Sequence, residues 1–318
     1  MASIGQRCAG ASAADLASSR PVGRRNRGRR RRWVALGVPL LLVAGFLAWQ
    51  YWPKPRPAPV PGNGAVASAD EPWVVAISAR GAGPPDAPSG KSCVGTLVSP
   101  KAVVTAAHCA SAPGATRVIV GRTDLRTKQG HAVGVADAWT APGWPERQGF
   151  FAGVTGPRVS PPDVGVLLLK TAVRERTLPM VTAGQATPAP GSRARVTGWR
   201  VSPQDEPVLW QTPTAVLDDD RCRQAAADAS SLFPRPEWHG YRYDRRAYLC
   251  AGEGATAFPI RPTDSGSPLV VHGRLAGVAN WKPGNDPRTP QFYGRVGTYT
   301  DRITGLIATA TKTGRFPG

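Results

Sequence analysis

The sequence has no basic motif interleaved with aromatic residues, the pattern that is typical of proteins that read nucleic acids. The 318-residue chain nevertheless carries a formal net charge of +19, and such an excess can attract an anionic partner. Nine arginines and one aspartate lie in residues 1–32, Lys54 and Arg56 follow, and the rest of the excess is spread thinly. We therefore expect a basic N-terminal tail and no nucleic-acid partner.

Long hydrophobic runs are also scarce, and the one at Trp33–Trp49 is not followed at a suitable distance by the small-x-small motif of a cleaved signal peptide. Its 17 uncharged residues would span about 26 Å as a helix, and residues 50–52 extend it to bilayer thickness. The arginines before it predict that the tail is cytoplasmic. The sequence thus predicts a cytoplasmic tail at 1–32 and a transmembrane signal anchor at 33–52. The alternative is cleavage of this segment, which would secrete the protein.

Cysteine is infrequent, and its count of five is odd. With this topology Cys8 would face the reducing cytoplasm and remain a thiol. The other four would lie outside, where they could pair. These are Cys93, Cys109, Cys222 and Cys250.

Helical stretches are few, and no internal repeat is visible. Alternating prolines favour an extended stalk at 53–68, and a globular domain is expected at 69–318. Many short runs rich in Val and Leu, separated by Gly, Pro, Asn and Asp, indicate an all-β barrel or sandwich. Two stretches favour helices, at 217–230 and 298–312. The expected strands lie near 71–78, 93–99, 102–107, 116–121, 163–170, 193–199, 267–271, 274–280 and 292–299.

The candidate nucleophile is Ser265, in the stretch TDSGSPLVV. A serine between aspartate and glycine is also an ordinary polar turn, so the assignment depends on a base and an acid elsewhere. His108 follows an apolar strand in VVTAAHC. A bridge from the adjacent Cys109 to Cys93 would close a hairpin and fix the loop that carries His108. The alternative is a histidine with a structural role.

The candidate acid is Asp163, at the mouth of the apolar strand in PPDVGVLLLK. A half-buried carboxylate there would accept a hydrogen bond from an imidazole and fix its tautomer. The alternative is a turn residue at the start of a strand. Asp124 is the rival acid, but Arg122 and Arg126 flank it, which indicates a solvated turn.

The order His, Asp, Ser, with the cores TAAHC and DSGSP, resembles the chymotrypsin-like (trypsin family) serine peptidases. The resemblance covers about residues 60–310, because PWVVAIS, RVTGW, YLCAG, GVANW and FYGRVGTYTDRI follow in the expected order. It implies an all-β fold of two six-stranded antiparallel β-barrels with a short C-terminal helix. It also implies a protein or peptide substrate, with no metal and no cofactor.

The resemblance assigns a role to each catalytic residue. Ser265 would attack the scissile carbonyl, His108 would take its proton and return it to the leaving amine, and Asp163 would orient His108. The N–H groups of Thr263 and Ser265 would form the oxyanion hole.

The resemblance also implies a substrate-binding edge and two disulfide bonds. The main chain at Asn280, Trp281 and Lys282 would pair with substrate as an added strand. The bridges would be Cys93–Cys109 and Cys222–Cys250.

The sequence departs from the family pattern around the nucleophile. Thr263 replaces a glycine, and its β-branched side chain is expected to turn the N–H away from the oxyanion and weaken catalysis. A cysteine pair that braces the specificity pocket is missing, with Arg261 in the place of its first member. Pro259 lies at the pocket floor, where trypsin-like enzymes have aspartate, and Lys282 and Gln291 replace small residues. We expect a narrow pocket without trypsin-type specificity, with Lys282 favouring an acidic side chain.

A second departure concerns activation. In the family, a newly cut N-terminal amine pairs with the aspartate before the nucleophile, here Asp264. The corresponding terminus would be Val60, but neither Lys nor Arg precedes it and Pro61 follows it. Trypsin-like activation is therefore not expected, and Asp264 either has another partner or depends on another cut in the stalk.

These features together predict a membrane-anchored, extracytoplasmic serine endopeptidase. Arginine outnumbers lysine 33 to 7, which indicates a bacterium with a high-GC genome. The alternatives are a catalytically impaired homologue that acts as a surface binding module, and a basic anchored protein that binds anionic cell-surface polymers.

Overall fold

The computed structural model describes ten segments of the chain. These are residues 63–79, 90–111, 115–144, 162–185, 188–199, 206–232, 243–253, 256–257, 262–282 and 289–317. The predictions for the cytoplasmic tail, the transmembrane anchor at 33–52, Cys8, Pro259 and Arg261 concern residues outside these segments. Within them, no helix combines the length and the apolar character that crossing a bilayer requires.

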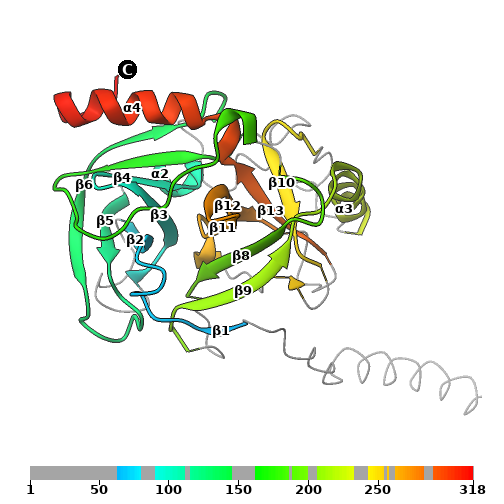
Figure 1. Ribbon diagram of the computed structural model, residues 1–318, viewed down its shortest axis with the longest axis horizontal. Coiled ribbons are helices and arrows are strands. Elements are labelled where there is room, and N and C mark those ends of the chain that lie inside the picture. The colour runs from blue at the N-terminus through cyan, green and yellow to red at the C-terminus, as the bar shows by residue number, and fades with distance from the viewer. Residues whose placement is uncertain are drawn as a thin grey trace, which may run out of the picture. The chain divides into compact units, whose positions relative to one another are not determined.

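Six antiparallel strands form a closed barrel in the first half of the described chain (Figure 1). They are β2 (Val74–Ala79), β3 (Cys93–Ser99), β4 (Ala102–Thr105), β5 (Ala115–Val120), β6 (His131–Thr140) and β7 (Gly165–Leu169). Their order around the barrel is β2-β3-β4-β7-β6-β5. The inward-facing side chains are mainly Val, Leu and Ile, which fit a pleated buried surface. This barrel confirms the prediction for the first half.

Seven strands form the second sheet, in the order β1-β9-β8-β11-β12-β13-β10. They are β1 (Gly64–Ala65), β8 (Arg193–Gly198), β9 (Trp210–Ala215), β10 (Tyr248–Ala251), β11 (Pro268–Val271), β12 (Arg274–Trp281) and β13 (Gln291–Arg295). A single bridge between Val216 and Ala251 joins the end of β9 to β10, so six of the strands curl into the second barrel.

The seventh strand of that sheet corrects one prediction. Gly64 and Ala65 pair with Gln211 and Trp210 of β9, so β1 is an edge strand outside the six that form the second barrel. This pairing, together with hydrogen bonds of the Val66 N–H to the Leu209 carbonyl and of the Ser68 N–H to the Thr123 hydroxyl, both at 2.9 Å, places these residues in the folded domain, although they were assigned to the stalk. The alternating prolines of the predicted stalk did not indicate this strand. Its two residues are held by hydrogen bonds with β9, which is distant in the sequence.

Both predicted helices are present, although their ends differ slightly from those expected. Helix α3 spans Asp219–Leu232, and the Asp218 carboxylate accepts a hydrogen bond from the Arg221 N–H at 2.7 Å near its first turn. Helix α4 spans Thr300–Thr313 and ends at Gly314, which adopts the left-handed conformation that favours glycine. A five-residue helix, α2 (Ala107–Ser111), was not predicted, and the strand expected at 102–107 ends at Thr105.

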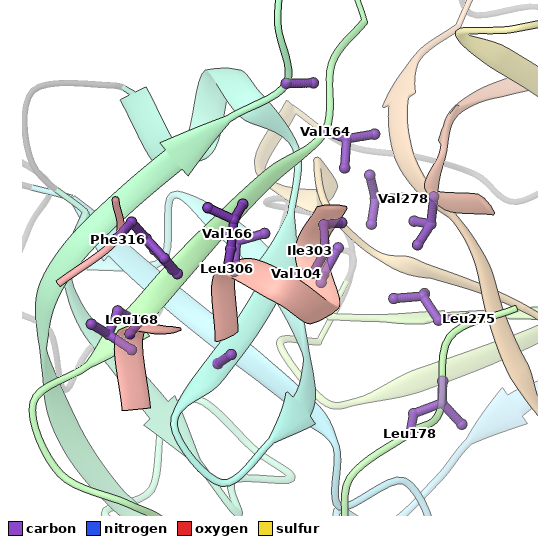
Figure 2. Packing of buried hydrophobic residues seen from close by; sticks show 14 of the residues in the cluster. Val104, Val164, Val166, Leu168, Leu178, Leu275, Val278, Ile303, Leu306 and Phe316 are labelled. Atoms are coloured by element: carbon purple, nitrogen blue, oxygen red, sulfur yellow. The ribbon is translucent and has the colours of Figure 1, made fainter. Parts of the chain in front are cut away.

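Helix α4 follows the second barrel but packs across strands of the first (Figure 1). Figure 2 shows Leu306 and Phe316 near Val166 and Leu168 of β7, and Ile303 beside Val104 of β4. The same core cluster continues through further buried side chains of β4, β11 and β12. This shared apolar layer joins the two barrels, and thereby sets the first barrel against the loop that carries Ser265.

Candidate active site

His108 and Asp163 form a two-point contact. The His108 backbone N–H donates to Asp163 Oδ1 at 2.9 Å, and His108 Nδ1 lies 2.7 Å from Asp163 Oδ2. A carboxylate only accepts hydrogen bonds, so Nδ1 carries the proton in this pair. The Asp163 side chain is 2 % exposed and that of His108 is 8 % exposed. The acid therefore fixes both the position of His108 and its tautomer.

Local structure explains how the two residues meet. His108 lies on α2, which the Cys93–Cys109 disulfide ties to the start of β3. Asp163 lies two residues before β7, which begins at Gly165. A Cβ atom at Gly165 would lie 2.7 Å from the Ala110 Cβ, so only glycine lets α2 and β7 approach this closely.

Ser265 follows the short 3-10 helix η5 (Pro262–Asp264) and is 4 % exposed. Its carbonyl accepts the Val94 N–H at 2.8 Å, and the next N–H, of Gly266, donates to Ala279 at 2.7 Å. Gly266 has φ +84°, and a Cβ there would lie 2.0 Å from the Val94 carbonyl oxygen. The loop is thus held between β3 of the first barrel and β12 of the second.

The Cys93–Cys109 bridge connects the nucleophile loop with the histidine. A ring nitrogen of His108 lies within 4.8 Å of the sulfur atoms of the bridge. The Cys109 sulfur is in turn 3.7 Å from the Ser265 carbonyl oxygen. Because both cysteines are oxidised, neither offers a thiolate to a metal. The bridge therefore links the loop that carries Ser265 to the helix that carries His108, and His108 in turn contacts Asp163 directly.

Thr263, the predicted oxyanion residue, lies inside η5. Among the described residues, His272 is the only non-glycine residue with positive φ, so Thr263 does not adopt the backbone conformation that glycine would permit. Its carbonyl and hydroxyl both accept hydrogen bonds from Lys91 Nζ, at 2.6 and 3.1 Å. Thr263 therefore has a polar contact that the sequence did not suggest.

Lys91 is a residue of the site that the sequence reasoning missed. Its Nζ also donates to Asp264 Oδ1 at 3.0 Å, so the aspartate before the nucleophile has an internal partner. Burial lowers the pKa of Lys91 below the ordinary lysine value of 10.5, although the Asp264 carboxylate acts in the opposite direction. The only signal in the sequence was a lysine two residues before a buried strand, in GKSC.

Trp144 was also missed. Its ring centroid lies 6.4 Å from that of His108, and its Nε1 donates to the Ser111 hydroxyl at 2.9 Å. The indole ring therefore lies beside the candidate base. No local pattern marked it, because Trp144 is distant from the other site residues in sequence.

The residues predicted to bind substrate lie at the end of β12 and the start of β13. Trp281 stacks on Phe292 with a centroid distance of 4.0 Å, and the Asn280 amide donates to the Tyr248 hydroxyl at 3.3 Å. Gln291 is fully buried and donates to the Trp281 carbonyl at 2.7 Å. The Gln291 amide therefore stabilises the end of β12. Lys282 is half-buried directly after β12.

Asp124, the rival acid, lies in a turn. The Arg126 guanidinium binds it at 2.7 to 3.0 Å, and this contact lowers the pKa of the Asp124 carboxyl. Both predicted disulfides are present, Cys93–Cys109 and Cys222–Cys250.

The chain matches the trypsin family model over residues 60–303. A trypsin from Saccharopolyspora erythraea is 31% identical over 245 residues, which cover 75% of this chain and 93% of that protein. The thrombin-like enzyme halystase from Gloydius blomhoffii is 28% identical over 225 residues, with coverage of 68% and 85%.

Two solved structures share the fold. Human heparin binding protein has a TM-score of 0.59 at 22% identity and covers 78% of this chain and 97% of its own. Mouse neuropsin, a serine protease, has a TM-score of 0.59 at 21% identity, with coverage of 77% and 98%. The family match, the bacterial relative and the two-barrel fold agree: this chain belongs to the trypsin family of serine endopeptidases.

Proposed function

We propose that this protein hydrolyses peptide bonds in proteins or peptides through a triad of Ser265, His108 and Asp163, outside the cytoplasmic membrane. The observation that carries the proposal is the two-point contact of Asp163 with the His108 ring and backbone. With Nδ1 protonated, Nε2 is left as the basic nitrogen of the ring. A neutral Nε2 is the group that a serine nucleophile needs as its base.

The reaction would follow from this arrangement. Ser265 Oγ attacks the scissile carbonyl carbon while its proton passes to His108 Nε2, and Asp163 stabilises the resulting imidazolium. The N–H groups of Thr263 and Ser265 would bind the negative oxygen of the tetrahedral intermediate. The C–N bond then breaks, Nε2 returns the proton to the departing amine, and water hydrolyses the acyl-enzyme by the same steps.

The test is labelling with a fluorophosphonate probe, which reacts covalently with an activated serine. Wild-type protein should be labelled and Ser265→Ala should not. Labelling that persists in Ser265→Ala would show that the reactive group lies elsewhere.

The location rests on the sequence alone. The apolar segment at 33–52 next to the arginine-rich tail supports a single-pass anchor with the peptidase domain outside. The relative from Saccharopolyspora erythraea supports a bacterial source.

With this topology Cys8 remains a free thiol on the cytoplasmic side, while the four other cysteines are bridged. In intact cells or right-side-out vesicles, a membrane-impermeant thiol reagent should leave the protein unmodified until the membrane is opened with detergent. After opening, one thiol per chain should react, at Cys8. Modification of Cys8 before opening, or its recovery in a disulfide with another cysteine of the chain, would contradict the orientation.

The specificity that fits the site is not that of trypsin. Lys282 and Gln291 occupy places where small residues would leave the pocket open, which supports a narrow pocket. The Lys282 ammonium would favour an acidic substrate side chain beside it. Pro259, which the resemblance assigns to the pocket floor, has no carboxylate that could bind a basic substrate side chain.

Replacing Thr263 by glycine is expected to raise turnover. Glycine lowers the backbone cost of directing this N–H toward the oxyanion, and one oxyanion donor contributes about 10²–10³ in turnover. The gain should stay within that limit, because the hydroxyl that Lys91 contacts is lost in the same change. The measurement is kcat on one peptide mixture. Thr263→Val is the control, because it keeps the β-branch and removes the hydroxyl. Equal or lower kcat for the glycine variant would show that Thr263 already supports a competent oxyanion hole.

The β-branched Thr263 also favours the second candidate function, a catalytically impaired homologue that binds surface partners. The fluorophosphonate probe separates the two functions. An impaired homologue would remain unlabelled in the wild type, and its binding would survive the loss of Ser265.

A further inference from the structure

We propose that a cavity on the second barrel, separate from the candidate triad, binds the carboxylate of an acidic peptide. The cavity has a volume of about 410 Å³. It lies where the turn between β11 and β12 meets the short 3-10 helix η2 (Ala183–Gln185) and the turn before β8. None of the described residues that line it belongs to the candidate active site, so the inference goes beyond the proposed function and does not depend on the triad.

Arg274 gives the cavity its positive charge. It is half-buried at the start of β12, and its Nη1 donates to the Met180 carbonyl at 3.2 Å. A guanidinium has five N–H donors, so this contact holds the group in place and leaves four donors. Among the described residues, no carboxylate forms an ion pair with Arg274. A half-buried guanidinium with one hydrogen bond and no counter-ion is suited to a two-point contact with a carboxylate.

Two further polar side chains that line the cavity can donate. Gln185 Oε1 already accepts from the Thr182 N–H at 3.4 Å and from the Thr182 hydroxyl at 3.2 Å, so the NH₂ group is the part of the amide that remains for a ligand. The Ser192 hydroxyl has no partner in the described part of the chain, and it can donate as well. No described residue that lines the cavity is acidic. An anion therefore meets donors and no competing carboxylate.

His272, which also lines the cavity, occupies a costly backbone position. The loop between Val271 and Arg274 has two residues, His272 with φ +49° and Gly273 with φ +72°. A two-residue loop with positive φ at both positions is typical of a type I′ turn, for which Asn-Gly is a favoured pair. Residues held in sparsely populated conformations gather at binding sites. We therefore assign the His272 imidazole to the same site as Arg274.

The apolar part of the cavity determines which anion fits. Val181 and Val271 are buried beside it, and Pro188 also lines it. A free inorganic anion cannot use this surface, whereas the methylene groups of a glutamate or the neighbouring residue of a peptide can bury against it. The volume is within the range of small-ligand sites. The ligand class is therefore a peptide carboxylate, from an acidic side chain or from a C-terminus, since both present the same group.

The position of the cavity separates it from the chemical step. Ser265 precedes β11, which begins at Pro268, whereas His272 follows the last residue of that strand, Val271. The four residues of β11 span about 13 Å. A carboxylate held beyond the end of the strand does not reach the nucleophile, so it contributes to the binding of a protein or peptide and leaves the reaction itself unchanged.

The main test measures peptide binding by calorimetry with the full-length chain carrying Ser265→Ala, so that the peptides are not cut. Three acetylated peptides of one sequence are compared. The first has a central glutamate and an amidated C-terminus, the second has glutamine in its place, and the third is the glutamine peptide with a free C-terminal carboxylate. The glutamate peptide should bind about tenfold or more tightly than the amidated glutamine peptide, because charge-assisted hydrogen bonds are lost in the latter. Preference for the third peptide would identify the C-terminal carboxylate as the source. Equal affinity for all three would overturn the proposal.

Arg274→Met in the same background removes the charge and keeps an apolar stem. The affinity for the carboxylate peptide should fall by about 10- to 100-fold. Arg193→Met is the matched control, because Arg193 is exposed on the neighbouring strand β8 and does not line the cavity. It should change the affinity by less than about threefold. Equal losses in the two variants would overturn the proposal, because the attraction would then come from the general positive charge of the protein.

Two further variants guard against a folding defect. Arg274→Lys keeps the charge and lacks the planar fork, so it should bind the carboxylate peptide more weakly than the parent at an unchanged Tm. Parental affinity in Arg274→Lys would contradict the two-point contact. His272→Asn introduces the favoured turn residue, so it should raise the Tm and weaken binding. A raised Tm with unchanged affinity would contradict the assignment of His272 to the site.

Inorganic phosphate separates a peptide site from a general anion site. At equal ionic strength, replacing chloride by phosphate should displace little of the bound glutamate peptide, because phosphate cannot contact the apolar side of the cavity. Displacement by phosphate as complete as that by an excess of competing glutamate peptide would overturn the assignment to a peptide. None of these outcomes depends on whether Ser265 is the nucleophile, so failure of this inference leaves the proposed function intact.

Discussion

Replacing Ser265 by alanine is expected to lower the turnover of a peptide substrate by up to about 10⁶. The hydroxyl is the atom that forms the acyl bond, and no other group in the site can take its place. His108→Ala should cost about as much, and the double variant should cost little more, because nucleophile and base act as a unit. The measurement is kcat on a peptide mixture, with protein from which host proteases have been removed. Turnover of the alanine variant near the wild-type level would contradict the triad.

Ser267→Ala is the control for this experiment. Ser267 lies two residues from the nucleophile, is fully buried, and its hydroxyl has no hydrogen-bond partner among the described residues. The segment is held through the Ser267 backbone, which accepts the Ala279 N–H at 2.8 Å. Removing an unpaired buried hydroxyl costs little, so this variant should keep its turnover. A large loss in Ser267→Ala would indicate that any substitution in the segment disturbs the loop.

Replacing Asp163 by asparagine is expected to lower kcat by about 10⁴. The two contacts of the carboxylate explain why such a small change has so large an effect. Oδ1 accepts the His108 backbone N–H and Oδ2 faces Nδ1. An asparagine would keep its oxygen on the backbone N–H and turn its NH₂ group toward Nδ1. The ring would then have to accept at Nδ1 and carry its proton on Nε2, where it cannot take the proton of Ser265.

The matched control for this variant is Asp124→Asn. Asp124 was the other candidate acid, and it is held by Arg126 in a turn. Its replacement should leave kcat unchanged, and the loss of one surface contact should alter stability by less than about 1 kcal/mol. The assignment of Asp163 as the catalytic acid would be contradicted if both asparagine variants kept the wild-type kcat. It would also be contradicted if Asp124→Asn had the lower kcat of the two.

Several features were readable from local sequence because their cause is local. The run Cys93–Ser99 was predicted as a strand and forms β3 with the same ends, because consecutive apolar residues with turn signals on both sides favour a buried strand. Strand β6 (His131–Thr140) was not predicted. It is mostly exposed or half-buried, so it has no apolar run to detect. Strand β9 was missed because its Pro213 argues against a strand.

The candidate catalytic residues were likewise accessible from the sequence, since each lies in a motif with a recognisable neighbourhood. His108 is followed by a cysteine, Asp163 is followed by an apolar strand, and Ser265 lies between an aspartate and a glycine. The motifs and their order indicated these residues as candidates. They did not reveal the geometry, because the two contacts between His108 and Asp163 join positions 55 residues apart.

The sequence by itself determined the β-class of the domain, the candidate triad and, through its resemblance to a family, the two disulfides. Only the tertiary structure decided what holds the nucleophile. Lys91 and Asp264 are separated by 173 residues, and nothing near either one in the chain indicates that they meet. Their pairing depends on closure of both barrels, because only then does the start of β3 reach η5 and exclude water from the ammonium. A lysine that would be an ordinary solvated charge in the unfolded chain thereby becomes a buried ion-pair partner, which is a property of the fold and of no local pattern.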